Sequence, residues 1–201
     1  MKNSTTDTMR MKGKDLITIG IFSALYFVIN FAFMLLGAIP IMWILMPGLI
    51  ALFTGIPYML LAAKVQKPGA IFLMGLITGL IYFITGQFTT VILITFVIGC
   101  GLAELVRFLT KYRSFMGNTI SFACFSIGMI GSPLPIWLFK ESFIAQISEQ
   151  GMSADYVASI EALSSTGMLV LIIAAPIVLA FVGAFIAKVL FKKHFVKAGI
   201  V

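Results

Sequence analysis

Aromatic and hydrogen-bonding side chains gather near several turns of this 201-residue chain, and they are the residues best suited to hold a small molecule. Aromatic rings stack on flat ligands, while a few polar groups fix a ligand's orientation. A single Trp or Tyr near a turn carries little information, so the prediction rests on the grouping. The predicted substrate-binding residues are Trp43, Tyr82, Gln87, Thr89, Trp137, Lys140 and Glu141.

Residue types needed for most catalytic and metal sites are missing or isolated. His194 is the only histidine and lies in a basic tail, while Cys100 and Cys124 lie in apolar runs without a ligand pattern around them. The sequence has no Walker A loop and no facing carboxylates within its apolar runs. We therefore expect no enzymatic activity, no metal site and no cofactor bound by this chain.

Two further groups of residues have both a structural and a functional interpretation. Glu104 and Arg107 are three positions apart and are placed to pair on one helix face; the alternative is contact with a cytoplasmic partner. Gly20 and Ala24, with Ser23 beside them, form a small-residue stripe that lets another helix approach closely. Packing within the protein is the ordinary interpretation of such a stripe, and docking of another subunit is the alternative.

Long apolar runs must position these residues. Most runs are about 20 residues long, enough for a helix rising about 1.5 Å per residue to cross about 30 Å of hydrocarbon. The runs cover residues 16–36, 41–63, 69–86, 88–109, 118–139 and 166–190. The sequence therefore predicts an all-α integral membrane protein, a compact bundle of six transmembrane helices forming a single domain over residues 1–201.

Basic residues set the orientation of this bundle. With the N-terminus in the cytoplasm, all of the 14 Lys and Arg residues except Lys140 fall on the cytoplasmic side. By the positive-inside rule, both termini are then cytoplasmic. An apolar content of 61% excludes an ordinary soluble domain, and the net charge of +7 is spread over short segments, which argues against nucleic-acid binding. The first apolar run is too long for a signal-peptide core, so we expect it to be retained.

Residues 140–165 form the one long connection and lie outside the cell in this topology. Apolar residues recur at helical spacing on both sides of Gly151, which predicts a short helix, a break and a second short helix. The segment is either a lid over the outer face or a plain connector.

The first helix carries a family likeness. Residues 14–28 (KDLITIGIFSALYFV) resemble the opening helix of the substrate-binding S components of energy-coupling factor (ECF) transporters, and more narrowly the Trep-Strep, or MptD-like, family. The resemblance implies a prokaryotic plasma-membrane protein that captures a small micronutrient at its outer face. It also implies partners, namely a transmembrane T subunit and two ATPases that use ATP. In the family an Ala-xxx-Ala pattern on helix one contacts the T subunit, and Gly20 and Ala24 occupy that pattern here.

The sequence leaves alternatives open for both the ligand and the class of protein. A small organic micronutrient is the expected ligand, and haem or another tetrapyrrole is the alternative, although no histidine is available at the outer face. A stand-alone secondary carrier or a structural membrane protein is the alternative to an S component.

Overall fold

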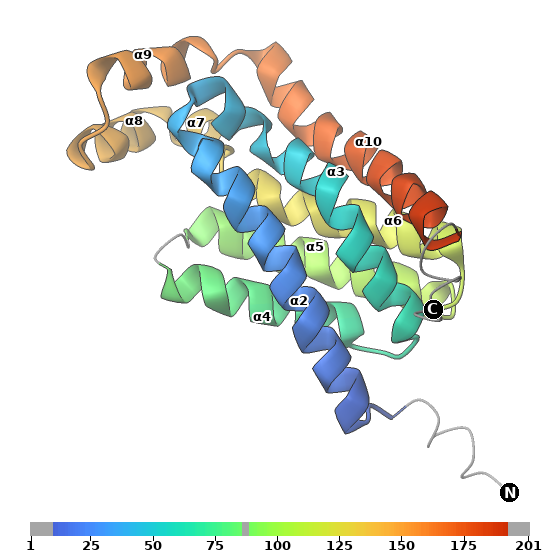
Figure 1. The fold of residues 1–201 in the computed structure, drawn as a ribbon. Coiled ribbons are helices and arrows are strands. Elements are labelled where there is room, and N and C mark those ends of the chain that lie inside the picture. The colour runs from blue at the N-terminus through green and yellow to red at the C-terminus, as the bar shows by residue number, and fades with distance from the viewer. Residues whose placement is uncertain (1–9, 86–88, 193–201) are drawn as a thin grey trace, which may run out of the picture.

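The fold is helical throughout the part of the chain that the computed structural model describes, residues 10–85 and 89–192. Figure 1 shows the helices lying side by side as a bundle, with two short helices at one end. In chain order the elements are α2 Gly13–Met34, the 3₁₀ helix η1 Leu35–Ala38, α3 Pro40–Lys64, α4 Ala70–Ile84, α5 Thr90–Leu109, α6 Phe115–Ser126, the 3₁₀ helix η2 Ile127–Gly131, α7 Pro135–Leu138, α8 Lys140–Glu149, α9 Ala154–Ala162 and α10 Thr166–Leu190.

Four helical segments are long and apolar enough to cross a membrane: α2 with η1, α3, α5 and α10. Two shorter apolar segments, α4 and Phe115–Gly131, accompany them. The 15 residues of α4 rise about 22 Å, less than the ~30 Å of hydrocarbon. Large apolar side chains remain exposed along these helices, as expected for surfaces that meet lipid rather than water.

Helix α3 forms the centre of the bundle, with α2 on one side and α10 on another (Figure 1). Its contact with α10 is close because glycines face each other there. A Cβ built on Gly55 would lie 2.5 Å from the carbonyl carbon of Gly183, and a Cβ on Gly183 would collide with the backbone oxygen of Leu52. Only glycine therefore fits on either side of this crossing.

The segment predicted as one helix over residues 118–139 is divided in the structure, and this expectation was wrong. Helix α6 gives way to η2, a turn follows, and α7 is a single short turn of helix. Gly128 lies so close to α5 that a Cβ there would be 2.7 Å from the Phe96 ring, and the Thr95 hydroxyl donates a hydrogen bond to the Gly128 carbonyl at 2.8 Å. Pro133 and Pro135 then prevent the helix from continuing, because proline lacks an N–H.

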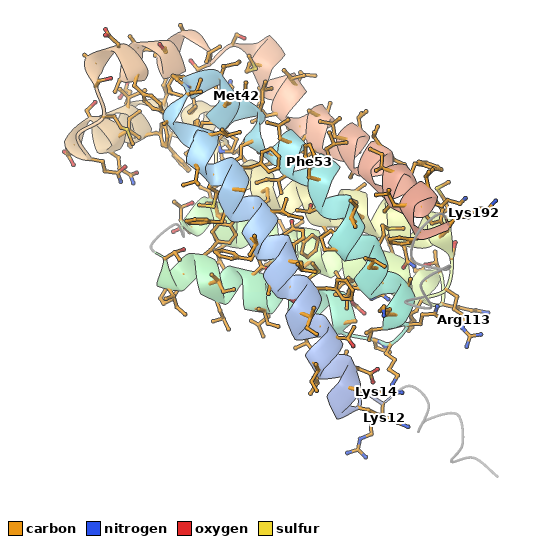
Figure 2. All side chains as sticks on the ribbon, viewed as in Figure 1. Lys12, Lys14, Met42, Phe53, Arg113 and Lys192 are labelled. Carbon is orange, nitrogen blue, oxygen red and sulfur yellow. The ribbon has the colours of Figure 1, made fainter. Side chains whose placement is uncertain are left out.

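Basic side chains mark one end of the bundle. Figure 2 shows Lys12, Lys14, Arg113 and Lys192 there, and the short α8 and α9 helices at the opposite end. We call these the basic end and the α8–α9 end. Helices α2, α4 and α6 lead away from the basic end, whereas α3, α5 and α10 return to it (Figure 1). Among the described Lys and Arg residues, only Lys140 belongs to the α8–α9 end.

Candidate ligand pocket

The α8–α9 end contains a partly open cavity of about 290 Å³, which we call the main cavity. Helices α8 and α9 cover it, and the ends of α3 and α5 form its base. Its lining residues are Trp43, Thr89, Ile92, Ser132, Phe143, Gln146, Ile147, Gln150, Met152, Tyr156 and Ile160.

A smaller cavity of about 70 Å³ extends from the same place toward the bundle interior. It shares Trp43, Ile92 and Ser132 with the main cavity, and its other lining residues are Met34, Met46, Tyr82 and Met129. We call the two together the α8–α9 pocket. Methionine side chains are flexible and polarisable, so this deeper part adapts its shape to an apolar group more readily than branched side chains would.

Trp43 stands at the junction of the two cavities. Pro40 occupies the first turn of α3, where its fixed φ favours helix initiation, and this places Trp43 one turn into the helix. The Trp43 ring stacks on Phe143 of α8, with ring centroids 5.7 Å apart and an interplanar angle of 15°. This stack joins the membrane-length helix α3 to the covering helix α8, and both rings present apolar faces to the cavity.

Tyr82 closes the deeper part of the pocket and is held in a buried polar network. Its hydroxyl donates a hydrogen bond to Asn30 Oδ1 at 3.0 Å, and Asn30 Nδ2 donates to the Tyr26 carbonyl at 2.9 Å. Both Asn30 and Tyr26 are almost completely buried. A buried carboxamide with both ends bonded is strongly fixed in orientation, so it fixes Tyr82 in turn.

Helices α8 and α9 are attached to the bundle by few polar contacts. The Tyr156 hydroxyl donates a hydrogen bond to the Gly37 carbonyl at 2.8 Å, whereas an exposed ion pair at 3.1 Å joins Lys140 of α8 to Glu161 of α9 and so links the two covering helices to each other. Burial raises the pKa of Tyr156 above its usual 10.0, so its hydroxyl stays protonated and able to donate at neutral pH. Between the two helices Gly151 has φ 83°, a left-handed conformation that suits glycine.

Apolar contacts complete this attachment. Ile147 of α8 and Ile160 of α9 are buried in a small cluster with isoleucines of the bundle. The other buried members of that cluster are Ile44, Ile130, Ile136 and Ile172. The covering helices therefore have a core of their own, separate from the main core of the bundle.

The polar groups that line the pocket are uncharged at neutral pH. Thr89 and Ser132 offer hydroxyls, and Gln146 and Gln150 offer carboxamides that both donate and accept hydrogen bonds. No cluster of His, Cys, Asp and Glu suited to a metal ion occurs within residues 10–85 and 89–192. This lining is suited to holding an uncharged polar ligand or one with an aromatic face.

The structure brings part of the predicted substrate-binding set together. Trp43, Tyr82 and Thr89 line the pocket. Trp137 instead packs beside it and donates a hydrogen bond from Nε1 to the Ser165 carbonyl at 3.1 Å. Lys140 pairs with Glu161, and the exposed Glu141 does not line the cavity, whereas Gln87 lies outside the described residues.

Sequence reasoning missed the residues that α8 contributes. Phe143, Gln146, Ile147 and Gln150 are spaced as i, i+3, i+4 and i+7, so they share one helix face. The apolar members of this face were recognised as a helical pattern, but the glutamines between them were not. Their position on the same face was the available signal that they turn toward the interior.

The predicted pairing of Glu104 with Arg107 is replaced by two separate contacts with the turn between α3 and α4. Arg107 is completely buried and donates hydrogen bonds to the Val65 carbonyl at 2.9 Å and to the Ala62 carbonyl at 3.3 Å. Glu104 accepts a hydrogen bond from the Gly69 N–H at 2.7 Å. The arginine therefore satisfies carbonyls at the end of α3, and the glutamate an N–H at the start of α4.

The small-residue stripe on α2 is divided between two faces. A Cβ built on Gly20 meets nothing within 4 Å, and Ala24 is exposed, so both lie on an open surface of the helix. Ser23 is fully buried on the adjacent face, and its hydroxyl has no hydrogen-bond partner in the structure. Gly20 and Ala24 are thus available to an approaching helix, whereas Ser23 is not.

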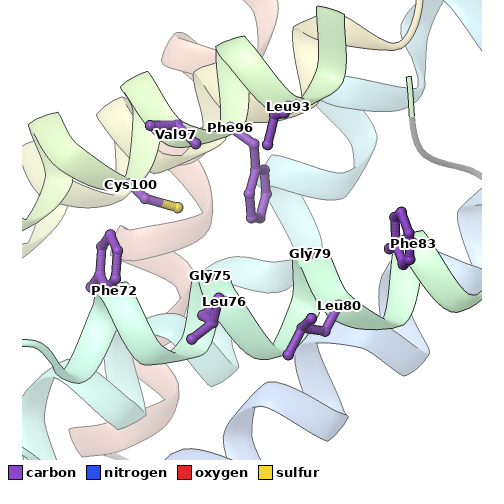
Figure 3. A pocket seen from close by; sticks show the side chains of 10 residues that line it. All are labelled: Phe72, Gly75, Leu76, Gly79, Leu80, Phe83, Leu93, Phe96, Val97 and Cys100. Carbon is purple, nitrogen blue, oxygen red and sulfur yellow. The ribbon is translucent and has the colours of Figure 1, made fainter. Parts of the chain in front are cut away.

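A third cavity, of about 240 Å³, lies between α4 and α5 (Figure 3). Gly75 and Gly79 form its floor, and Phe96 and Cys100 project from α5. Every other lining side chain is aliphatic or aromatic, and several, including Leu76 and Leu80, are half exposed. This groove has the character of a surface that faces lipid, and it offers a polar ligand no orienting group.

These features define a helical integral membrane protein with a ligand-sized pocket at one end. The chain belongs to a family of hypothetical bacterial integral membrane proteins, Trep_Strep, whose model matches residues 13–197. This confirms the Trep-Strep family, the narrower of the two resemblances of the first helix. No curated protein and no solved structure matched the chain.

Proposed function

We propose that this protein is the substrate-binding S component of an ECF-type importer, and that the α8–α9 pocket holds its ligand. The observation that carries the proposal is the pocket itself. It is a partly open cavity beneath two short helices, has aromatic walls at Trp43 and Phe143, and has neutral hydrogen-bonding groups at Gln146 and Gln150. Ligand pockets commonly combine a largely apolar lining with a few such polar groups.

The size and polarity of the pocket favour a small organic micronutrient. A volume of about 290 Å³ is at the lower end of the ~300–1,000 Å³ typical of small-molecule sites. Haem or another tetrapyrrole is the weaker alternative. Its carboxylates require cationic partners, which the described lining does not supply, and a Met or Tyr side chain of the lining would have to serve as the iron ligand in place of histidine.

The direction of transport follows from the proposed orientation. With the basic end in the cytoplasm, both termini are cytoplasmic and the α8–α9 pocket faces the outside. Gly20 and Ala24 then lie on an open face of α2 where a T subunit would dock. ATP hydrolysis belongs to two partner ATPases, and this chain acts as a binding protein rather than as an enzyme.

The docking part of the proposal is tested by co-expression with a T subunit and two ATPases from the same genome. Because nothing lies within 4 Å of a Cβ at Gly20, Gly20→Leu is expected to fold normally but to abolish co-purification of the partners. Gly101→Leu is the matched control, since Gly101 on α5 is exposed and equally open. Association that survives both Gly20→Leu and Ala24→Leu would overturn the docking surface.

The ligand part is tested separately by extracting small molecules from the purified protein and identifying them by mass spectrometry. The chain has two tryptophans, so Trp137→Phe leaves Trp43 as the only one. A ligand that is identified and added back should change the fluorescence of the Trp137→Phe variant as strongly as that of the wild type. A response that disappears with Trp137→Phe would place the ligand outside the α8–α9 pocket.

A stand-alone secondary carrier or structural membrane protein is the competing proposal. It predicts uptake or activity that is independent of the ATPases and that collapses with the ion gradient. Uptake that is lost on deletion of the ATPases and that is insensitive to an ionophore supports the S-component proposal over this one.

A further inference from the structure

The basic end carries an open hollow that the proposed transport function does not use. Its volume is about 630 Å³, and it lies between the end of α5 and the turn that joins α3 to α4. The lining residues are Gln66, Phe108, Leu109, Lys111, Tyr112 and Arg113. We call it the basic-end hollow.

The backbone conformation at residues 111–112 positions the two cations of the hollow, Lys111 and Arg113. Lys111 and Tyr112 both have positive φ, 55° and 62°, and the Tyr112 N–H donates to the Arg107 carbonyl at 2.9 Å. This conformation turns Tyr112 inward, where only 3% of it is exposed and its ring lies 5.2 Å from the Arg107 guanidinium carbon. Lys111 and Arg113, on either side of Tyr112, remain exposed.

No carboxylate of the described chain neutralises these cations. The ion pairs in residues 10–85 and 89–192 are Lys67 with Asp15 and Lys140 with Glu161. The closest acid along α5, Glu104, is directed to the Gly69 N–H instead. Lys111 and Arg113 therefore offer an uncompensated positive charge at the mouth of the hollow.

The remaining lining supplies an apolar surface immediately before the charges. Phe108 and Leu109, in the last turn of α5, are 64% and 69% exposed. Along α5 the exposed apolar side chains of its last turn therefore come first, and the two cations follow just beyond the end of the helix. A phospholipid has the same order, with acyl chains in the hydrocarbon and phosphate at its boundary.

We propose that the basic-end hollow binds an anionic phospholipid of the cytoplasmic leaflet. Lys111 and Arg113 contact the phosphate and its headgroup, and Phe108 and Leu109 contact the upper part of an acyl chain. The proposal rests on the orientation given above, in which the basic end is cytoplasmic. It does not depend on the identity of the transported ligand or on the T subunit.

The test is native mass spectrometry of the purified protein titrated with phosphatidylglycerol, and in parallel with phosphatidylcholine. The wild type is expected to retain phosphatidylglycerol selectively. Because each Lys or Arg near an anionic surface strengthens attachment about fivefold, Lys111→Gln with Arg113→Gln should weaken phosphatidylglycerol binding roughly 30-fold. Lys12→Gln with Lys14→Gln is the matched control, as it removes two exposed cations of the same end but outside the hollow.

Each result decides the proposal. Selective loss in the Lys111/Arg113 variant supports it, whereas equal binding by all three proteins, or equal loss in both variants, overturns a defined site. Glycerol phosphate added in excess should not displace the lipid, because it lacks the acyl chain; displacement would show a phosphate site instead of a lipid site. If the double variant fails to fold, Arg113→Gln alone should still lower phosphatidylglycerol affinity about fivefold.

Discussion

The crossing of α3 and α10 allows one substitution to be predicted with a definite sign. A Cβ added at Gly55 would lie 2.5 Å from the Gly183 carbonyl carbon, 2.8 Å from its oxygen and 3.0 Å from the Ala184 nitrogen. Carbon atoms in van der Waals contact are about 3.5–4.0 Å apart, so α10 must move outward by roughly 1 Å. All three obstructing atoms belong to the backbone, so no side-chain rotation relieves the clash.

The expected effect of Gly55→Ala follows from two opposing contributions. Overpacking costs about 1–3 kcal/mol, and a clash with backbone atoms that cannot rotate away lies in the upper part of that range, about 2–3 kcal/mol, whereas replacing glycine by alanine inside a helix returns about 1 kcal/mol. The net destabilisation is therefore about 1–2 kcal/mol, which lowers Tm by about 2–8 °C in a chain of this length. Gly101→Ala, where nothing lies within 4 Å of the new Cβ, should instead raise Tm by about 1–4 °C.

Thermal unfolding of the two variants in the same detergent, followed by circular dichroism, measures this difference. Both substitutions add one methyl group to a helical glycine, so propensity changes alike and only the surroundings differ. Equal shifts in Tm would refute the close backbone contact between α3 and α10. A Gly55→Ala variant more stable than the wild type would refute it still more directly.

Three further predictions concern the two ends of the bundle. Arg107→Leu should destabilise the protein by about 3–5 kcal/mol, because it leaves the buried carbonyls of Ala62 and Val65 without hydrogen-bond donors. In the same unfolding assay, Arg113→Gln at an exposed position should change stability by less than about 0.5 kcal/mol. Tyr156→Phe removes the hydrogen bond to the Gly37 carbonyl, worth about 1 kcal/mol, and should speed amide hydrogen exchange in residues 140–165 about fivefold. Ser159→Ala in the same helix should leave this exchange rate unchanged. Lys140→Gln breaks an exposed ion pair and should leave both Tm and ligand affinity nearly unchanged; a large loss of affinity would return Lys140 to the binding site.

Much of the fold follows from local sequence, because an apolar run of sufficient length specifies a helix wherever it occurs. The runs around α2, α3, α5 and α10 are of this kind, and Gly151 separates α8 from α9 for a local conformational reason. The division of α6 from α7 is different. Gly128 shortens the helix through its contact with Phe96 of α5, a residue 32 positions earlier, and a single sequence does not indicate which glycine meets which neighbour.

The candidate sites show the same distinction between local and distant causes. Trp43, Tyr82 and Thr89 were found because aromatic and polar residues near helix ends are conspicuous. Gln146 and Gln150 were missed because an amphipathic helix with glutamines looks like a surface helix until its covering position is known. Arg107 was assigned to a partner on its own helix, whereas it donates hydrogen bonds to carbonyls at the end of α3, more than 40 positions away, and to Asn118 of α6.

The two ends of the bundle differ in how firmly they are joined, and this difference indicates where a ligand enters. At the basic end, Lys67 forms an ion pair with Asp15 at 2.6 Å, Glu104 accepts a hydrogen bond from the Gly69 N–H, and Arg107 donates to a carbonyl at the end of α3. Charged groups therefore join α2, α3, α4 and α5. Hydrogen bonds to charged groups are about twice as strong as those between neutral groups. At the α8–α9 end, the Tyr156 bond between neutral groups supplements one small isoleucine cluster, and the exposed ion pair joins α8 only to α9. Opening the α8–α9 pocket should therefore cost less free energy than loosening the opposite end, so we expect a ligand of this pocket to enter by displacement of α8 and α9 while the basic end keeps its structure.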